Sequence, residues 1–154
     1  MNANLLRHAM NLWPPFLGAG IRVEKIATDF RNVKVILKQG VVNRNIVGVH
    51  FGGSLFAMTD PFFMLMVSQN LGQNYIVWDQ AAHIEFIKPG KGNVYANFDL
   101  SQEQIDSLIA EAQSGNKVLR DFTVEVIDGV GDVVARICKT LYVRKRRGPI
   151  KHKH

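Results

Sequence analysis

Residues 43–66 form the most apolar stretch of the chain, and they hold an acid and a proline in its middle: NRNIVGVHFGGSLFAMTDPFFMLM. We predict a loop over 40–51 and a helix from about Gly52 to Asn70. This predicted helix is apolar on almost every face, and a helix of that kind is buried on all sides. The chain has 154 residues, which suffices for one domain with a single core. The rest of the chain must therefore wrap around this helix.

The segments that flank the apolar run have strand and surface-helix patterns. We expect a short N-terminal helix that ends at Pro14 and Pro15, a hairpin over 21–28 and 32–38, a strand over 74–90 paired with 92–100, an amphipathic helix over 101–115 and two long strands over 118–146. The fold class is then α+β, with about six antiparallel strands around one buried helix. We expect residues 1–146 to form a single domain. Such a sheet covers the helix incompletely and leaves edge strands, which predicts a homodimer or a dimer of dimers.

The net charge of +6 comes entirely from the C-terminal tail. Residues 144–154 carry six Lys or Arg and no acid, while 1–143 carry 13 bases and 13 acids. We expect 147–154 to be a disordered tail. Alternatives for the tail are a continued strand that brings Arg144 or Arg146 to the phosphates of a coenzyme, or contact with an anionic membrane or nucleic acid. Without interleaved aromatic residues, a dedicated nucleic-acid surface is not supported.

Other classes of protein are disfavoured by the remaining composition. The single cysteine, Cys138, excludes an internal disulfide. The longest apolar run is interrupted by Asp60 and Pro61, so we expect no membrane insertion and a cytoplasmic protein. No group of His and Cys has the spacing of metal ligands, and we expect no metal and no resident cofactor.

The loop and helix start carry a motif of spaced asparagine, glycines and an acid. The chain resembles the hotdog-fold acyl-CoA thioesterases of the phenylacetate pathway, and more closely an uncharacterised bacterial branch of thioesterase-like hotdog proteins. The family motif runs Asn-x-x-Gly-x-x-His-Gly-Gly, with an acid seven residues after the second glycine. The positions in register are Asn45, Gly48, Gly52, Gly53 and Asp60. The chain departs from the family at Phe51, which stands at the histidine position, with His50 one residue earlier.

The resemblance implies a thioester hydrolase that acts on a coenzyme A thioester. By this resemblance Asp60 acts as general base or nucleophile, the backbone N–H of Gly52 is the oxyanion donor, and Asn45 orients the substrate or the water. Glycine at a helix start lets a substrate approach free N–H groups. The implied substrate-binding residues, which complete the candidate site, are Gly53, His50, Phe51, Asp79 and Arg144. Asp79 is included because it lies ten residues before Pro89, where related thioesterases have a small hydroxyl residue facing the active site.

Plainer interpretations stay open at each of these positions. The glycine pair also suits a tight turn, and Asp60 could bond across a dimer interface rather than react. Pro61 could kink the helix and aim Asp60 into a cleft, or could be a matter of packing. At the level of function, the main alternative is a non-catalytic protein that binds acyl thioesters or fatty acyl groups. A hotdog dehydratase is disfavoured because no histidine motif of that type is present.

Overall fold

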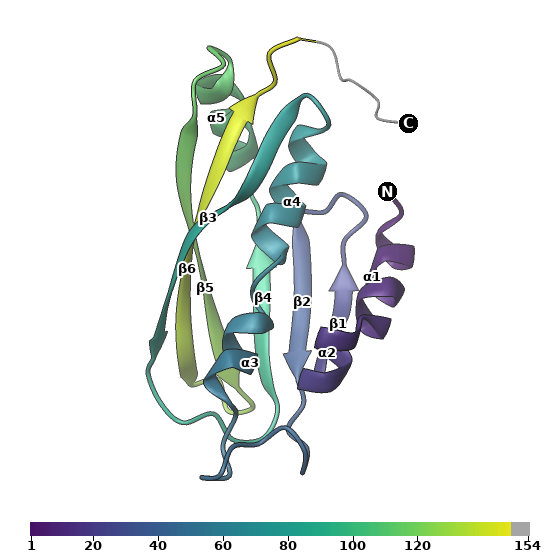
Figure 1. The fold of residues 1–154 in the computed structure, drawn as a ribbon, viewed down its shortest axis with the longest axis vertical. Coiled ribbons are helices and arrows are strands. Elements are labelled where there is room, and N and C mark those ends of the chain that lie inside the picture. Colours follow the sequence, from purple (N-terminus) through teal and green to yellow (C-terminus); the bar gives the residue numbers. More distant parts are fainter. Residues whose placement is uncertain (149–154) are drawn as a thin grey trace.

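A single antiparallel sheet of six strands, in the order β1-β2-β4-β5-β6-β3, builds the molecule. The computed structural model describes residues 1–148. The strands are β1 (Ile21–Ile26), β2 (Asn32–Leu37), β3 (Tyr75–Phe86), β4 (Val94–Asp99), β5 (Val118–Asp128) and β6 (Val133–Lys145). The helices are α1 (Ala3–Leu12), α2 (Pro14–Ala19), α3 (Gly52–Ala57), α4 (Phe62–Leu71) and α5 (Gln102–Ala112). Figure 1 shows the sheet curving around α4, which confirms the predicted layout of strands around a central helix.

The apolar helix is buried as predicted, but it is two helices and not one. Helix α3 ends at Ala57, α4 begins at Phe62, and a turn separates them. The side chains of α4 point into the core on most faces: Phe62, Phe63, Met66, Val67 and Leu71 are buried. The ring of Phe98 on β4 lies 5.0 Å from that of Phe62 and 5.1 Å from that of Phe63. Phe62 and Phe63 are therefore core residues and do not line a binding pocket.

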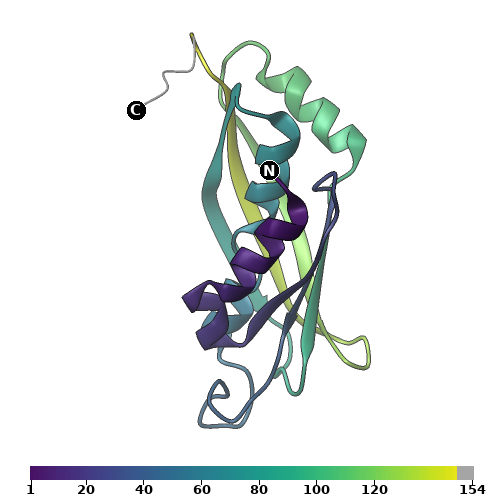
Figure 2. The ribbon, with the colours of Figure 1, turned by 90° about the vertical axis from the view of Figure 1, so that its right-hand side faces the viewer.

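Several local signals predict the surface elements correctly. The hairpin of β1 and β2 forms, with Ile21 opposite Leu37, and β5 and β6 form the second hairpin. Helix α5 begins at the predicted capping box, in which the N–H of Gln104 donates to Ser101 Oγ and the N–H of Ser101 donates to Gln104 Oε1. This helix lies at the end of the molecule where the chain enters β5 (Figure 2).

One prediction about the connections is wrong. The strand over 74–90 does not pair with 92–100, since β3 pairs with β6, and β4 lies between β2 and β5. The segment between β3 and β4 crosses the sheet, and Lys88 on it forms ion pairs of 2.7 Å with Asp128 and 2.6 Å with Asp132. The N-terminal helix ends before Pro14 as predicted, since α1 stops at Leu12, but a second helix that was not predicted, α2, begins at Pro14, because proline suits the first position of a helix.

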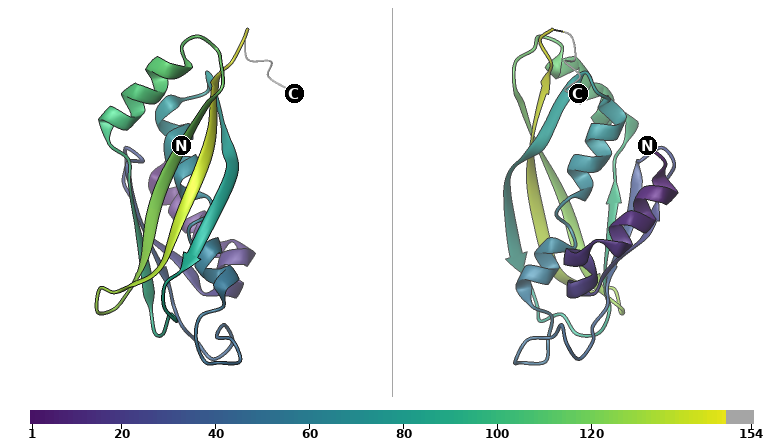
Figure 3. Two further views of the ribbon diagram at one scale, coloured as in Figure 1. Left: turned by 90° about the vertical axis from the view of Figure 1, so that its left-hand side faces the viewer. Right: turned by 45° about the vertical axis from the view of Figure 1, so that its right-hand side comes forward.

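The two edges of the sheet differ in what covers them. At the β1 edge, Asn11 on α1 accepts from the N–H of Val23 at 2.7 Å and donates to its carbonyl at 3.0 Å. At the opposite edge, the 12-residue strand β3 pairs with β6 on one side only. Figure 3 shows β3 along this free edge. Within residues 1–148, no helix has the length and apolar character needed to cross a membrane. The prediction of a tail over 147–154 falls almost wholly outside the described residues.

Candidate functional site

The break between α3 and α4 is a direct consequence of Pro61. Proline has no N–H, so it cannot donate to the carbonyl of Ala57 four residues earlier. The N–H of Asp60 donates to that carbonyl instead, at 3.3 Å, and the N–H of Thr59 donates to the carbonyl of Phe56 at 3.0 Å. These two hydrogen bonds each join residues three apart, and they tighten the chain into a turn. The Asp60 side chain leaves this turn with 53% of its surface exposed, so the predicted position inside an apolar helix is wrong.

A buried lysine holds Asp60, and the sequence did not single it out. Lys139 lies on β6, and its side chain is only 1% exposed. Its Nζ donates to Asp60 Oδ1 at 2.8 Å and lies 3.2 Å from Asp79 Oδ1. The same nitrogen is 5.5 Å from the centre of the Phe56 ring on α3. One ammonium group therefore joins two carboxylates from two separate parts of the chain.

Asp79 reaches this cluster because it lies opposite Leu141, one inward-facing position from Lys139 on β6. The register against β6 shifts between Asp79 and Ala81, so the side chains of Asp79 and Ala82 both fall opposite inward-facing residues of β6. Burial raises the pKa of Asp79, the charge and hydrogen bond of Lys139 lower it, and the charge of Asp60 raises it again. The structure thus brings Asp60 and Asp79 together within one chain, through Lys139.

The glycine pair begins α3, where the N–H groups point out of the helix. The cap residue Phe51 makes no side-chain hydrogen bond to this helix end. Across residues 1–148, the N–H groups of Gly52 and Gly53 have no hydrogen-bond acceptor. An added Cβ at Gly52 would lie 3.0 Å from the ring of Phe86, and one at Gly53 would meet the ring of Phe51. Both neighbouring rings are more than half exposed, so each can move away from the helix start.

The loop residues of the motif have structural contacts. Asn45 Oδ1 accepts from the N–H of Val47 at 3.0 Å and of Val49 at 3.2 Å, which closes the loop on itself. His50 is 3% exposed, its N–H donates to the carbonyl of Gly90, and its Nε2 lies 2.6 Å from the carbonyl of Gly92. These bonds tie the loop to the segment between β3 and β4. They shape the approach to α3 and leave the roles predicted for Asn45 and His50 as predictions.

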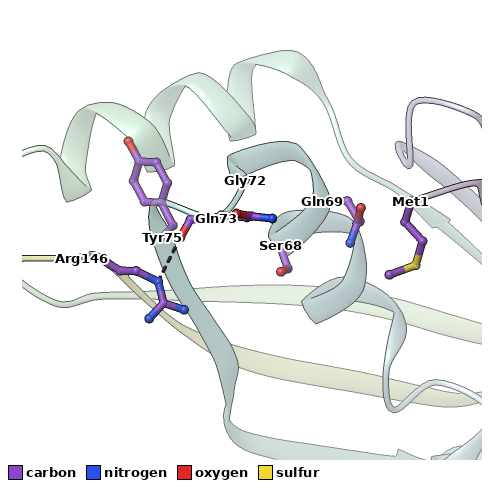
Figure 4. A pocket seen from close by; sticks show the side chains of 7 residues that line it. All are labelled: Met1, Ser68, Gln69, Gly72, Gln73, Tyr75 and Arg146. Atoms are coloured by element: carbon purple, nitrogen blue, oxygen red, sulfur yellow. Dashed lines mark hydrogen bonds between the residues drawn. The ribbon is translucent and has the colours of Figure 1, made fainter. Parts of the chain in front are cut away.

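Two hollows lie at opposite ends of the α3–α4 pair, and of these two only the first is lined by predicted site residues. The first, of about 360 Å³, is largely apolar, and its lining residues are Val49, His50, Gly52, Leu55, Phe86, Ile87, Lys88, Pro89 and Gly90. The second, of about 530 Å³, lies at the opposite end of α4 and is lined by Met1, Ser68, Gln69, Gly72, Gln73, Tyr75 and Arg146 (Figure 4). There Arg146 Nε donates to the carbonyl of Gln73 at 2.9 Å. Arg144 lines neither hollow, and its buried Nε has no acceptor in the described part of the chain.

Solved structures of known proteins share this architecture. A protein of unknown function from Pseudomonas aeruginosa, described as a probable thioesterase, is 21% identical, with a TM-score of 0.82 over 93% of this chain and 95% of that one. A thioesterase from Haemophilus influenzae is 14% identical, with a TM-score of 0.68 over 100% and 96% of the two chains. The PaaI protein of the Escherichia coli phenylacetic acid degradation operon is 17% identical, with a TM-score of 0.58 over 94% and 93%. The fold is thus the hotdog fold, as predicted.

Sequence comparison defines the family more narrowly than the fold does. No curated protein matches this chain significantly in sequence. A family model described as a domain of unknown function, DUF4442, matches residues 2–143. This match takes in the loop, both central helices, five whole strands and β6 as far as Val143. The chain therefore belongs to the DUF4442 family, with a hotdog fold like that of thioesterases.

Proposed function

We propose that the protein hydrolyses acyl thioesters, with an acyl-CoA as substrate. The observation that carries this proposal is the Asp60 carboxylate, which is half exposed at the helix break and bonded at one oxygen to buried Lys139. A carboxylate that is fixed at one oxygen and solvated at the other can take a proton from water or attack a carbonyl carbon. The likeness of the fold to proteins named thioesterases supports this choice of reaction.

The reaction needs a base and a donor for the developing oxyanion. Asp60 takes the proton of a water that attacks the thioester carbonyl carbon, or attacks that carbon itself. The carbonyl oxygen gains negative charge, and the free N–H of Gly52 donates to it. Collapse of the intermediate expels the thiolate of coenzyme A. When water is the nucleophile, this gives the free acid directly; when Asp60 is the nucleophile, it leaves an acyl anhydride on Asp60, which a water then hydrolyses. The apolar hollow beside Gly52 would hold the apolar part of the substrate.

The positions of these two groups in one chain imply that two copies share each reaction centre. Gly52 begins α3 and Asp60 follows its end. The six-residue helix α3 and the turn after it separate them, and the helix alone rises roughly 8 Å from Gly52 to Ala57. A donor and a base that act on one carbonyl each lie about 3 Å from it. We therefore propose that Gly52 of one copy works with Asp60 of another.

The free β3 edge is the surface that would join these two copies. A long edge strand without proline or lysine pairs readily with another strand, and β3 has neither in its 12 residues. Trp78 and Phe86 on this strand are 48% and 59% exposed. We expect light scattering to give at least twice the mass of the chain. Ala81→Lys, in the middle of β3, should lower the mass to that of one chain.

Val130→Lys is the matched control for this measurement. Val130 lies in the turn between β5 and β6 and is 83% exposed, so the same charge is added away from the β3 edge. We expect this variant to keep the mass of the wild type. A single-chain mass for the wild type would contradict the assembly, and so would an unchanged mass for Ala81→Lys.

The proposed activity is tested by incubating the wild type with short, medium, long and aromatic acyl-CoA thioesters and measuring free thiol. Turnover of at least one class is expected, and the preferred acyl group names the substrate. The presence of Phe51 where related thioesterases have histidine favours one other function, binding of acyl thioesters without turnover. Thiol release at the uncatalysed rate from all classes, with saturable binding in equilibrium dialysis, would contradict hydrolysis and support that alternative.

A further inference from the structure

Lys139 occupies a position where the pattern of β6 calls for an apolar side chain. The residues on either side of it in the inward phase, Ile137 and Leu141, are both 0% exposed. An ammonium group at such a place has lost its water and must be paired. A well-packed apolar residue in its place commonly gives equal or greater stability. Stability of the fold therefore does not explain a lysine at position 139.

The lysine does explain the placement of Asp60. Within residues 1–148, Lys139 is the only cation within ion-pair distance of Asp60. It is therefore the only charged side chain that links Asp60 to the sheet. The ammonium donates to Oδ1 at 2.8 Å. The described residues give Oδ2 no hydrogen-bond partner. Strand β6 thus holds Oδ1 of Asp60 through Lys139 and leaves Oδ2 available to react.

Asp79 fixes the lysine in turn. Asp79 Oδ1, on β3, lies 3.2 Å from Lys139 Nζ. The charged groups that act on Asp79 are Lys139 and Asp60, and burial raises the pKa of Asp79. Burial therefore makes Asp79 easier to protonate than an ordinary aspartate, while the ammonium keeps its 2.8 Å hydrogen bond to Asp60 Oδ1.

We propose that Lys139 is the positioning residue of this site: it fixes the Asp60 carboxylate at the break between α3 and α4, with Asp79 as its second anchor. This rests on the proposed hydrolysis, in which Asp60 reacts. Lys139 is not expected to touch the substrate, because its side chain is only 1% exposed.

Two substitutions with opposite expected signs test this role. Lys139→Met removes a cation beside Asp60, so the acid limb of the pH profile of kcat/KM should move up by about one pH unit, and kcat should fall about tenfold or more from lost orientation. Asp79→Asn removes a neighbouring negative charge, so the acid limb should move to lower pH. In an Asp60→Asn background, Lys139→Met should cause no further loss of kcat.

The titration of the Asp60 carboxyl, followed by carbon NMR, gives a readout that does not depend on turnover. The midpoint of this titration should move to higher pH in Lys139→Met and to lower pH in Asp79→Asn. Arg136→Met is the matched control, because Arg136 lies on the same strand and bonds two carboxylates, Glu85 and Glu125, on the exposed face. It should change neither the titration nor kcat.

An Asp60 titration that stays in place in folded Lys139→Met would overturn the proposal, even if the wild type hydrolyses thioesters. Should Lys139→Met fail to fold, Lys139→Gln, which removes the charge but keeps a polar side chain, replaces it in the same titration. If the wild type turns over no thioester, the proposed function fails, and the NMR titration still decides whether Lys139 positions Asp60.

Discussion

Replacement of Gly52 by proline is expected to lower kcat for thioester hydrolysis by about 100- to 1,000-fold, or roughly 3–4 kcal/mol of transition-state stabilisation. The reason is the loss of a single N–H group, the proposed donor to the oxyanion. Gly52 is the first residue of α3, where proline is well tolerated. Phe51 before it has φ −65° and ψ 130°, a conformation that suits a residue preceding proline. The helix should therefore keep its place.

Gly52→Ala separates the lost donor from the added carbon. Either substitution places a Cβ about 3.0 Å from the ring of Phe86, so any crowding is common to both variants. Alanine keeps its N–H, so we expect kcat within about tenfold of the wild type. Equal losses in the two variants, measured by thiol release, would show that crowding matters and that the N–H is not the donor.

The same proline variant also tests whether two copies share a reaction centre. A mixture of Gly52→Pro and Asp60→Asn chains, unfolded and refolded together, forms mixed dimers with one complete centre each. Random assembly of a symmetric dimer then restores about a quarter of the wild-type activity. Activity that stays at the level of the separate variants would place both groups in a single chain.

The sequence predicts those parts of the fold that depend on local signals. Helix α5 follows from its capping box, the two hairpins from alternating strands and short turns, and the buried helix from its lack of a polar face. The pairing of β3 with β6 was missed because the choice of strand partners is made by the whole sheet. The Pro-Gly sequence after β3 indicated a turn but gave no information on which strand came next in space.

The residues of the candidate site also divide into those that a local sequence pattern indicates and those that it does not. Asp60 and Gly52 can be found from their spacing in the motif, and Asp79 from its distance to Pro89. Lys139 lies 79 residues from Asp60 in the chain, and no local pattern connects the two. One signal was nevertheless present: a lysine between Ile137 and Leu141 breaks the apolar alternation of β6. A charged residue on the inward face of a central strand needs a partner of opposite charge. An acid in an apolar segment, such as Asp60, is a candidate for that partner.

The measurement that tests the account most directly is the hydrolysis of the preferred acyl-CoA by Asp60→Asn beside the wild type. Asparagine keeps the shape of the side chain and an acceptor for Lys139, but it can neither take a proton from water nor act as the carboxylate nucleophile. We expect a folded variant, shown by an unchanged circular dichroism spectrum, in which kcat falls by about a hundredfold or more. Equal turnover in the two proteins would contradict the assignment of Asp60 and with it the proposed mechanism.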